Sequence, residues 1–155
     1  MKTTVSDRIE KQIELRAPRS RVWKALTTAA QFGAWFGVKL EGEFAPRQKI
    51  EGKLTIRGLE QLTMELKVEQ MEPEHTFSFR WIPYAVEKDV DYSAEEPTLV
   101  EFSLRETASG TLLRVIESGF DRVPLARRVK AFEMNDQGWA GQLKRIEEYL
   151  AHGSV

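Results

Sequence analysis

Few side chains in this sequence have the chemistry of a nucleophile or a metal ligand. The chain has no cysteine, which excludes a disulfide scaffold, a thiolate nucleophile and any cysteine-ligated zinc or iron–sulfur site. Its two histidines, His75 and His152, lie far apart in the sequence. Two such imidazoles do not favour a histidine metal centre or a general-base triad. We therefore expect no metal and no cofactor.

Glu117 is the side chain best suited to act as an acid or a base. It alternates with Leu113 and Val115 on one face of an expected strand, so we expect it to point inward. A buried carboxylate needs partners. Its structural role would be to accept a hydrogen bond from the backbone or from the Trp139 indole, and its alternative role would be ligand contact or proton transfer. No phosphate-binding, dinucleotide, nucleophile-elbow or HExxH motif accompanies it.

The charges nearly cancel, with 23 Lys and Arg against 24 Asp and Glu and a formal net charge of -1. No whole-molecule field would therefore attract nucleic acid or an anionic membrane. A basic cluster near Arg127 is flanked by acidic residues and lacks interleaved aromatics, which indicates a solvated face. An acidic cluster lacks the glycine turn of a calcium loop, and we interpret it as a solvated loop: Glu87, Asp89, Asp91, Glu95 and Glu96 around Lys88.

No stretch of the chain has the character of a membrane segment. Residues 1–11 carry charge from the second position onward, so we expect no signal peptide. The longest uncharged run, residues 25–38, has 14 residues, whereas a bilayer crossing takes roughly 20 apolar ones. We predict a cytoplasmic protein without membrane insertion, folded as a single domain over residues 1–155.

Alternation of apolar and polar residues predicts about seven strands. The first lies in residues 8–16, and six more follow one another after the first 35 residues. The turns between these six are too short for crossover helices, so the strands are expected to form an antiparallel meander. The six contain alternating residues at 36–40, 50–56, 62–68, 77–81, 100–104 and 113–117.

Two short helices are expected directly after the first strand. Pro18 suits the first turn of a helix, and apolar residues follow it at helical spacing. Thr28 and Gln31 fit a capping box that would begin the second helix, which carries Phe32 and Trp35.

A longer helix is expected at the C-terminal end, over about residues 136–151. Its apolar residues recur at helical spacing from Trp139 to Leu150, and Asn135 or Asp136 could cap it. Residues 119–134 are ambiguous, because Pro124 interrupts them.

This order of elements predicts an α+β fold in which a curved antiparallel sheet wraps around the C-terminal helix. Ordinary side chains need not fill the space between them, so a small-molecule cavity is one outcome. A close-packed aromatic core is the other, and periodicity alone leaves both open. The inward aromatics of the sheet, opposite Trp139 and Leu143, would line the cavity or fill the core: Phe77, Phe79, Trp81 and Phe102.

Several short motifs occur in an order that resembles the family named for the activator of the ATPase of the ninety-kilodalton heat-shock chaperone. The resemblance covers nearly the whole chain. The family is part of the START-like, or polyketide-cyclase-like, superfamily, so the resemblance implies a helix-grip fold and favours a cavity. The motifs are residues 17–27 (APRSRVWKALT), 34–37 (AWFG), 117–120 (ESGF) and 138–139 (GW), followed by Leu143, Tyr149 and Leu150.

The resemblance also implies roles for particular residues. Trp35 and Phe36 would lie at or near the cavity entrance, and Gly138 would let the helix approach the sheet closely. Eukaryotic activators that contact the chaperone carry a separate N-terminal domain. We expect no such domain in a chain of 155 residues, which argues against stimulation of the chaperone.

The leading hypothesis is a non-enzymatic module that binds a small hydrophobic or amphipathic ligand between sheet and helix. The alternatives are a stress-related, co-chaperone-like contact with the chaperone, a homodimer formed through exposed aromatics of the second helix, and a cyclase- or hydrolase-like enzyme. The enzyme would use Glu117, with His75 or Tyr84 as distant candidates. The predicted ligand contacts are Trp35, Phe36, Met64, Phe77, Phe79, Trp81, Phe102, Leu104, Glu117, Phe120, Met134, Trp139 and Leu143.

Overall fold

A computed structural model describes residues 7–87 and 90–152 of the chain. Expectations about residues 1–6, Lys88 and Asp89 lie outside the described residues. The elements are β1 (Arg8–Leu15), α1 (Arg19–Thr27), α2 (Ala29–Phe36), β2 (Val38–Glu41), β3 (Lys49–Leu54), β4 (Thr63–Glu72), β5 (Thr76–Trp81), β6 (Thr98–Glu106), β7 (Thr111–Ser118), the 3-10 turn η1 (Phe120–Arg122) and α3 (Leu125–His152).

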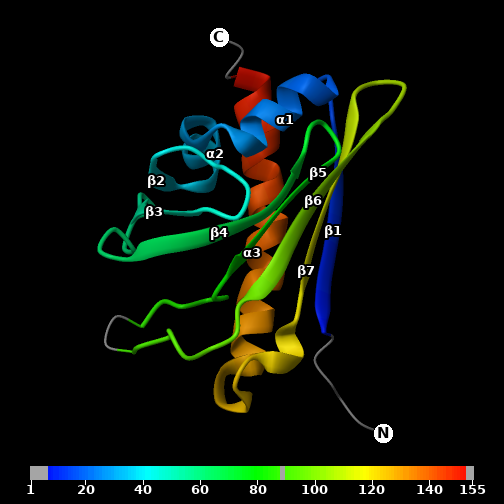
Figure 1. Cartoon of the computed structure of the whole chain (residues 1–155). Coiled ribbons are helices and arrows are strands. Elements are labelled where there is room, and N and C mark those ends of the chain that lie inside the picture. Colours follow the sequence, from blue (N-terminus) through cyan, green and yellow to red (C-terminus); the bar gives the residue numbers. More distant parts are fainter. Residues whose placement is uncertain (1–6, 88–89, 153–155) are drawn as a thin grey trace, which may run out of the picture.

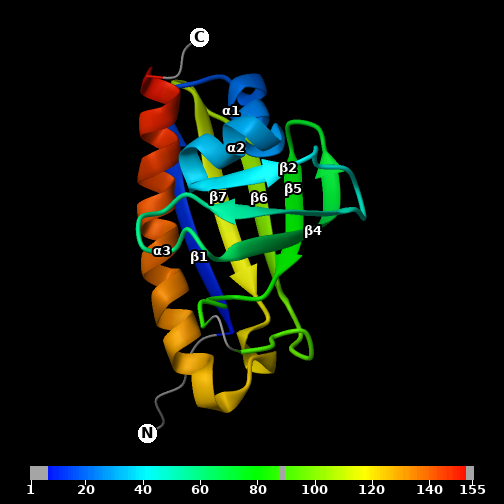
Figure 2. The same ribbon diagram turned by 90° about the vertical axis from the view of Figure 1, so that its left-hand side faces the viewer.

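All seven strands form one antiparallel sheet in the order β1-β7-β6-β5-β4-β3-β2. The sheet is strongly twisted, and Figure 2 shows β2 and β4 running across the direction of β1 and β7. Figure 1 shows α3 running along the sheet, with α1 and α2 near its C-terminal end. The predicted α+β helix-grip architecture, with about seven strands and two short helices after the first, is confirmed.

The two short helices join the sheet to α3. Gly37 ends α2 in the left-handed region, at a φ of 101°, which a residue without a side chain adopts most easily. The last carbonyls of α2 then lack helical partners. Arg145 Nε donates to the Trp35 carbonyl at 2.6 Å and Gln142 Nε2 to the Phe36 carbonyl at 2.9 Å, so α3 completes the end of α2. At the other end, Thr28 makes no side-chain cap, and the expected capping box is absent.

The interior is packed with aromatic rings contributed by α2 and the centre of the sheet. Phe32 stacks on Phe36, with ring centroids 4.9 Å apart, and meets Phe79 edge to face at 6.3 Å. Phe77 lies against Phe102 at 6.3 Å. These rings are buried, so the centre of the sheet under α1 and α2 is solid core.

The C-terminal helix begins eleven residues earlier than the sequence pattern indicated, at Leu125 rather than near residue 136. Pro124 directly precedes it and accepts a hydrogen bond from the Arg127 N–H with its carbonyl, so the proline starts the helix and does not break it. Asn135 and Asp136 therefore lie inside α3 and do not cap it. Within the described residues, none of the helices combines the length and apolar character that crossing a membrane requires.

One irregularity of the sheet positions the site. The pairing of β4 with β5 starts at Lys67 and Arg80 and is shifted by a bulge between Val68 and Gln70. Residues 63–66 of β4 remain paired with β3 but have no partner on β5 among the described residues. The two strands therefore separate, and a gap opens between the first half of β4 and the chain that follows β5.

Candidate functional site

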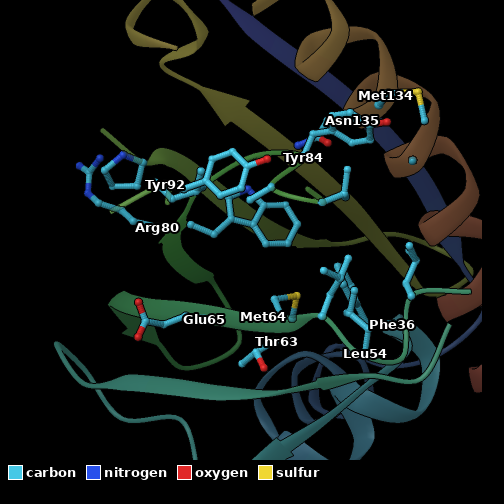
Figure 3. A pocket seen from close by; sticks show the side chains of 18 of the residues that line it. Phe36, Leu54, Thr63, Met64, Glu65, Arg80, Tyr84, Tyr92, Met134 and Asn135 are labelled. Carbon is cyan, nitrogen blue, oxygen red and sulfur yellow. The ribbon is translucent and has the colours of Figure 1, made fainter. Parts of the chain in front are cut away.

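A pocket of about 950 Å³ opens at this gap and extends to α3. Figure 3 shows Leu54 and Met64 on one side of the cavity and Tyr84 and Asn135 on the other. Its volume lies in the range of small-molecule sites in proteins, roughly 300–1,000 Å³. Its apolar lining from the sheet and its connections consists of Leu54, Ile56, Leu59, Leu62, Met64, Ile82, Ala85, Val86 and Pro97.

Three aromatic side chains from three different elements form the inner end of the pocket. Phe36 ends α2, Trp81 ends β5 and Trp139 lies in the middle of α3. The two indoles stack with centroids 5.7 Å apart and planes 28° apart, and Phe36 meets them edge to face at 5.8 and 6.2 Å. This aromatic trio offers ring faces to a ligand, the surface that flat apolar molecules prefer.

Glu117 lies directly behind the aromatic trio and is completely buried. Its Oε2 accepts hydrogen bonds from Trp81 Nε1 at 2.7 Å and Thr98 Oγ1 at 2.6 Å. Its Oε1 accepts from Trp139 Nε1 at 2.8 Å, and Asn135 Nδ2 bonds both oxygens at 3.0 and 3.2 Å. The predicted structural role, a bond from the Trp139 indole, is confirmed.

The indole N–H groups of Trp81 and Trp139 and the amide nitrogen of Asn135 can only donate hydrogen bonds, so the carboxyl oxygens of Glu117 are their acceptors. The network fixes both tryptophan rings in place from behind and leaves no N–H of either indole for a ligand. Glu117 does not line the pocket itself, because Trp81, Trp139 and Asn135 lie between it and the cavity.

One face of α3 supplies the opposite side of the pocket, with Asn135, Gly138, Trp139 and Gln142 at positions one turn apart; we call these four residues the helix wall. A methyl group built on Gly138 would meet nothing within 4 Å. The expectation that Gly138 allows close approach to the sheet is therefore wrong. Its missing side chain leaves open space at the pocket instead.

The outer part of the pocket is lined by charged side chains whose charges cancel. Lys49, Lys67 and Arg80 line it together with Glu65, Glu69 and Glu95, three cations and three anions. Arg80 pairs with Glu69 at 3.3 Å. The rim therefore does not by itself select a charged ligand.

The described residues of the segment 83–97, which are 83–87 and 90–97, form one side of the pocket and are connected to α3 by Arg127. The Arg127 guanidinium forms an ion pair with Glu95, donates to the Pro83 carbonyl at 2.8 Å and lies 4.9 Å from the centre of the Tyr92 ring. Tyr84, also on this segment, has a φ of 50°, which is unusual for a bulky residue. The expectation of a solvated face is therefore wrong for Arg127, and that of a solvated loop is wrong for Glu95, because the paired side chains are only 20% and 15% exposed.

The structure brings five of the thirteen predicted ligand contacts to the pocket: Phe36, Met64, Trp81, Met134 and Trp139. The other eight are buried elsewhere and do not line it: Trp35, Phe77, Phe79, Phe102, Leu104, Glu117, Phe120 and Leu143. Trp35 donates its indole N–H to the Ala25 carbonyl, and with Phe36 it is too buried to form the expected dimer patch. Tyr84 lines the pocket, whereas His75 lies in an exposed turn outside it.

The sequence analysis did not predict that Asn135 and Gln142 of the helix wall line the pocket. It also did not predict this for Leu59 and Leu62, in the connection before β4. Asn135 and Gln142 carried a usable signal, because these two uncharged amides lie at helical spacing from Trp139 and so interrupt the apolar face of the helix. Leu59 and Leu62 lie in a turn rich in charged and polar residues, where alternation gives no signal.

Comparison with known proteins identifies the family. A profile described as activator of Hsp90 ATPase homolog 1-like protein matches residues 16–151. None of the curated protein sequences matches the chain.

Solved structures share the fold at low sequence identity. Protein MLL2253 from Mesorhizobium loti is 22% identical, with 93% of this chain and 96% of that one covered and a TM-score of 0.74. The Aha1 dimer from Colwellia psychrerythraea is 18% identical, with 96% and 98% covered and a TM-score of 0.71. DynU16, from the dynemicin biosynthetic locus, is 20% identical at a TM-score of 0.70, with 96% of this chain but only 48% of DynU16 covered.

At these identities the structural neighbours show the helix-grip fold alone. The profile match extends over most of the sequence, and the chain therefore belongs to the activator of Hsp90 ATPase homolog 1-like family.

Proposed function

We propose that this protein binds a small hydrophobic or amphipathic molecule in the pocket between β4, the segment 83–97 and α3. The observation that carries the proposal is a cavity of about 950 Å³ whose inner end is an ordered aromatic trio. Burial of apolar ligand surface there would provide the affinity, at roughly 25 cal/mol per Å² before the costs of association. The balanced charges at the outer part suit a polar end of the ligand that stays near water.

Catalysis has weaker support. The carboxylate with the best chemistry, Glu117, is covered by the two indoles and has donors on both oxygens. It would reach a ligand only after those bonds break. A general base must lie within hydrogen-bond reach of the proton that it removes, and Glu117 in this arrangement is a positioning residue for the aromatic trio.

Contact with the heat-shock chaperone and homodimer formation stay predictions. The Colwellia psychrerythraea protein is described as a dimer. In this chain the buried Trp35 and Phe36 offer no patch for such an interface, and among the described residues the most exposed large apolar side chain is Leu125 at the start of α3.

Filling the pocket tests the proposal. The fluorescent probe N-phenyl-1-naphthylamine is titrated into the wild-type protein and into Gly138→Leu and Gly141→Leu. Both glycines lie in α3, and a Cβ on either meets nothing within 4 Å, but only Gly138 lines the pocket. Each substitution removes a helical glycine and should stabilise the protein by about 0.5–1 kcal/mol.

We expect the wild type and Gly141→Leu to bind the probe with the same affinity and Gly138→Leu to lose at least tenfold. Both variants should melt above the wild type, which shows that the loss of binding is not loss of folding. Probe binding unchanged by Gly138→Leu, or no binding to the wild type, contradicts the proposal.

A further inference from the structure

The orientation of the Asn135 amide is determined by the carboxylate behind it. Its nitrogen donates to both oxygens of Glu117, at 3.0 and 3.2 Å. The reversed amide would place Oδ1 against two carboxylate oxygens, all of them acceptors, and is therefore excluded. Oδ1 must point away from Glu117, towards the cavity that Asn135 lines.

The Oδ1 atom of Asn135 accepts no hydrogen bond from the described residues, and it is not sealed from solvent. The second amide of the helix wall is arranged in the same way, since Gln142 donates with Nε2 to the Phe36 carbonyl. Its Oε1 is buried without a partner. On this side of the pocket the amide nitrogens are used within the protein, and the oxygens are left as acceptors.

The surroundings of Asn135 Oδ1 are apolar and spacious. The neighbouring indoles have already donated their N–H groups to Glu117, so they offer ring faces without a donor. Gly138, one turn further along α3, leaves room for a ring beside the amide. An anionic group would meet the Asn135 oxygen and, behind its amide, the Glu117 carboxylate.

We propose that the helix wall recognises a hydrogen-bond donor, and that the ligand is a flat, neutral aromatic or polycyclic molecule with a hydroxyl group. The ring lies on the aromatic trio near Gly138, and the hydroxyl donates to Asn135 Oδ1. The inference rests on the proposed function and narrows it: fatty acids and other anions do not place their charged group at this end of the pocket.

Three naphthalene derivatives distinguish the contribution of a hydrogen-bond donor to affinity from the contributions of ligand size and apolar surface. Displacement of N-phenyl-1-naphthylamine is measured with 2-naphthol, with 2-methoxynaphthalene, which keeps the oxygen but cannot donate, and with 2-naphthoate. A hydrogen bond to an otherwise unpartnered acceptor should make naphthol the tightest, by about three- to tenfold over the ether. Naphthoate should bind more weakly than the ether.

The variant Asn135→Leu removes the acceptor, and there the ratio of the naphthol and ether dissociation constants should fall to about one. Gln137→Leu, which removes an exposed amide of α3 that does not line the pocket, should keep the wild-type ratio. If Asn135→Leu does not fold, the wild-type series alone decides.

Equal binding of naphthol and its ether to the wild type overturns the inference, and so does a preference that survives in Asn135→Leu. Either result leaves the proposed function intact, because apolar ligands still bind. Failure of the wild type to bind any of the compounds, or the fluorescent probe, overturns both.

Discussion

A single carboxylate fixes the geometry of the aromatic end of the pocket. Glu117 collects hydrogen bonds from β5, β6 and α3, and two of its partners are the indoles that a ligand would touch. Its role is therefore to hold Trp81 and Trp139 in one arrangement, in addition to satisfying buried donors.

Glu117→Gln tests this role with almost no change in shape. The new amide nitrogen must face at least one indole N–H or the Asn135 amide nitrogen, and a buried donor is then left without an acceptor. We expect a loss of about 2–4 kcal/mol in the free energy of unfolding, from the unsatisfied buried donor and the lost hydrogen bonds to the carboxyl group. Urea denaturation followed by tryptophan fluorescence measures it.

The exposed Glu65→Gln, at the rim of the pocket, serves as the matched control and should change stability by less than about 0.5 kcal/mol. If Glu117→Gln has the same free energy of unfolding as the wild type, the hydrogen bonds to Glu117 do not stabilise the fold.

Among the elements, the segment 83–97 depends on α3 for its position. Arg127 is the main connection, with an ion pair to Glu95, a bond to the Pro83 carbonyl and a ring contact with Tyr92. The paired side chains are mostly shielded from solvent, 20% and 15% exposed, so the pair is stronger than a surface salt bridge.

Arg127→Ala should release this segment without unfolding the sheet. We expect amide hydrogen exchange in the described parts of residues 83–97 to become about tenfold faster or more, because local opening loses roughly 1–3 kcal/mol of opposing interaction. Exchange in β6 and β7 should stay as in the wild type. Arg128→Ala is the control, since Arg128 bonds the Val123 and Asp121 carbonyls and does not reach the segment. If hydrogen exchange is unchanged in Arg127→Ala, contacts other than those of Arg127 hold the segment in place.

The order of the elements could be predicted because alternation and helical spacing report which side chains face the core. The start of α3 could not, because its early residues give a broken apolar pattern. Leu125 is 79% exposed, and Asn135 and Gly138 face a cavity, so before Trp139 only the small Ala131 is fully buried. Residues that line a cavity break the pattern by which a helix is recognised.

The place of the pocket could not be predicted for a different reason. The sequence suggested that Phe77, Phe79 and Phe102 surround a cavity, but in the structure they pack against one another and α2. The cavity lies where β4 separates from β5, after the pair Lys67 and Arg80. The end of a strand pairing depends on the bulge and on the bend of the whole sheet, which local periodicity does not encode.

For the whole molecule, the response to pH is dominated by local carboxylates, because the net charge is only -1. Asp7 directly precedes β1, and its carboxylate accepts a hydrogen bond from the backbone N–H of Asp121 in η1. Burial acts to raise the pKa of Asp7, but hydrogen bonds from Asp121 and Gly119 outweigh it and lower that pKa. The shared hydrogen bond with Asp7 raises the pKa of Asp121, and the charge of Asp7 adds to this.

A raised pKa in the folded state stabilises the fold at low pH, and this contribution is lost as the pH rises through that pKa. The substitution Asp121→Asn removes the ionisation that costs stability as the pH rises. It keeps the backbone N–H that donates to Asp7 Oδ1 at 3.0 Å. We therefore expect the variant to melt above the wild type at pH 7 and to lose this advantage by about pH 3, where the Asp121 carboxyl is protonated in both states of the wild type. Calorimetry from pH 3 to 7 measures the difference.

Asp91→Asn is the same substitution at another site, and its expected effect on the melting temperature at pH 7 has the opposite sign. The Ser93 backbone N–H, 2.9 Å away, lowers the pKa of Asp91, so its carboxylate stabilises the fold above the ordinary aspartate pKa and the contribution disappears as the pH falls. Asp91→Asn should therefore melt slightly below the wild type at pH 7 and level with it at about pH 3. If both variants shift in the same direction at pH 7, the effect comes from net charge, and the local hydrogen bonds at Asp7 and Ser93 do not govern the pH response.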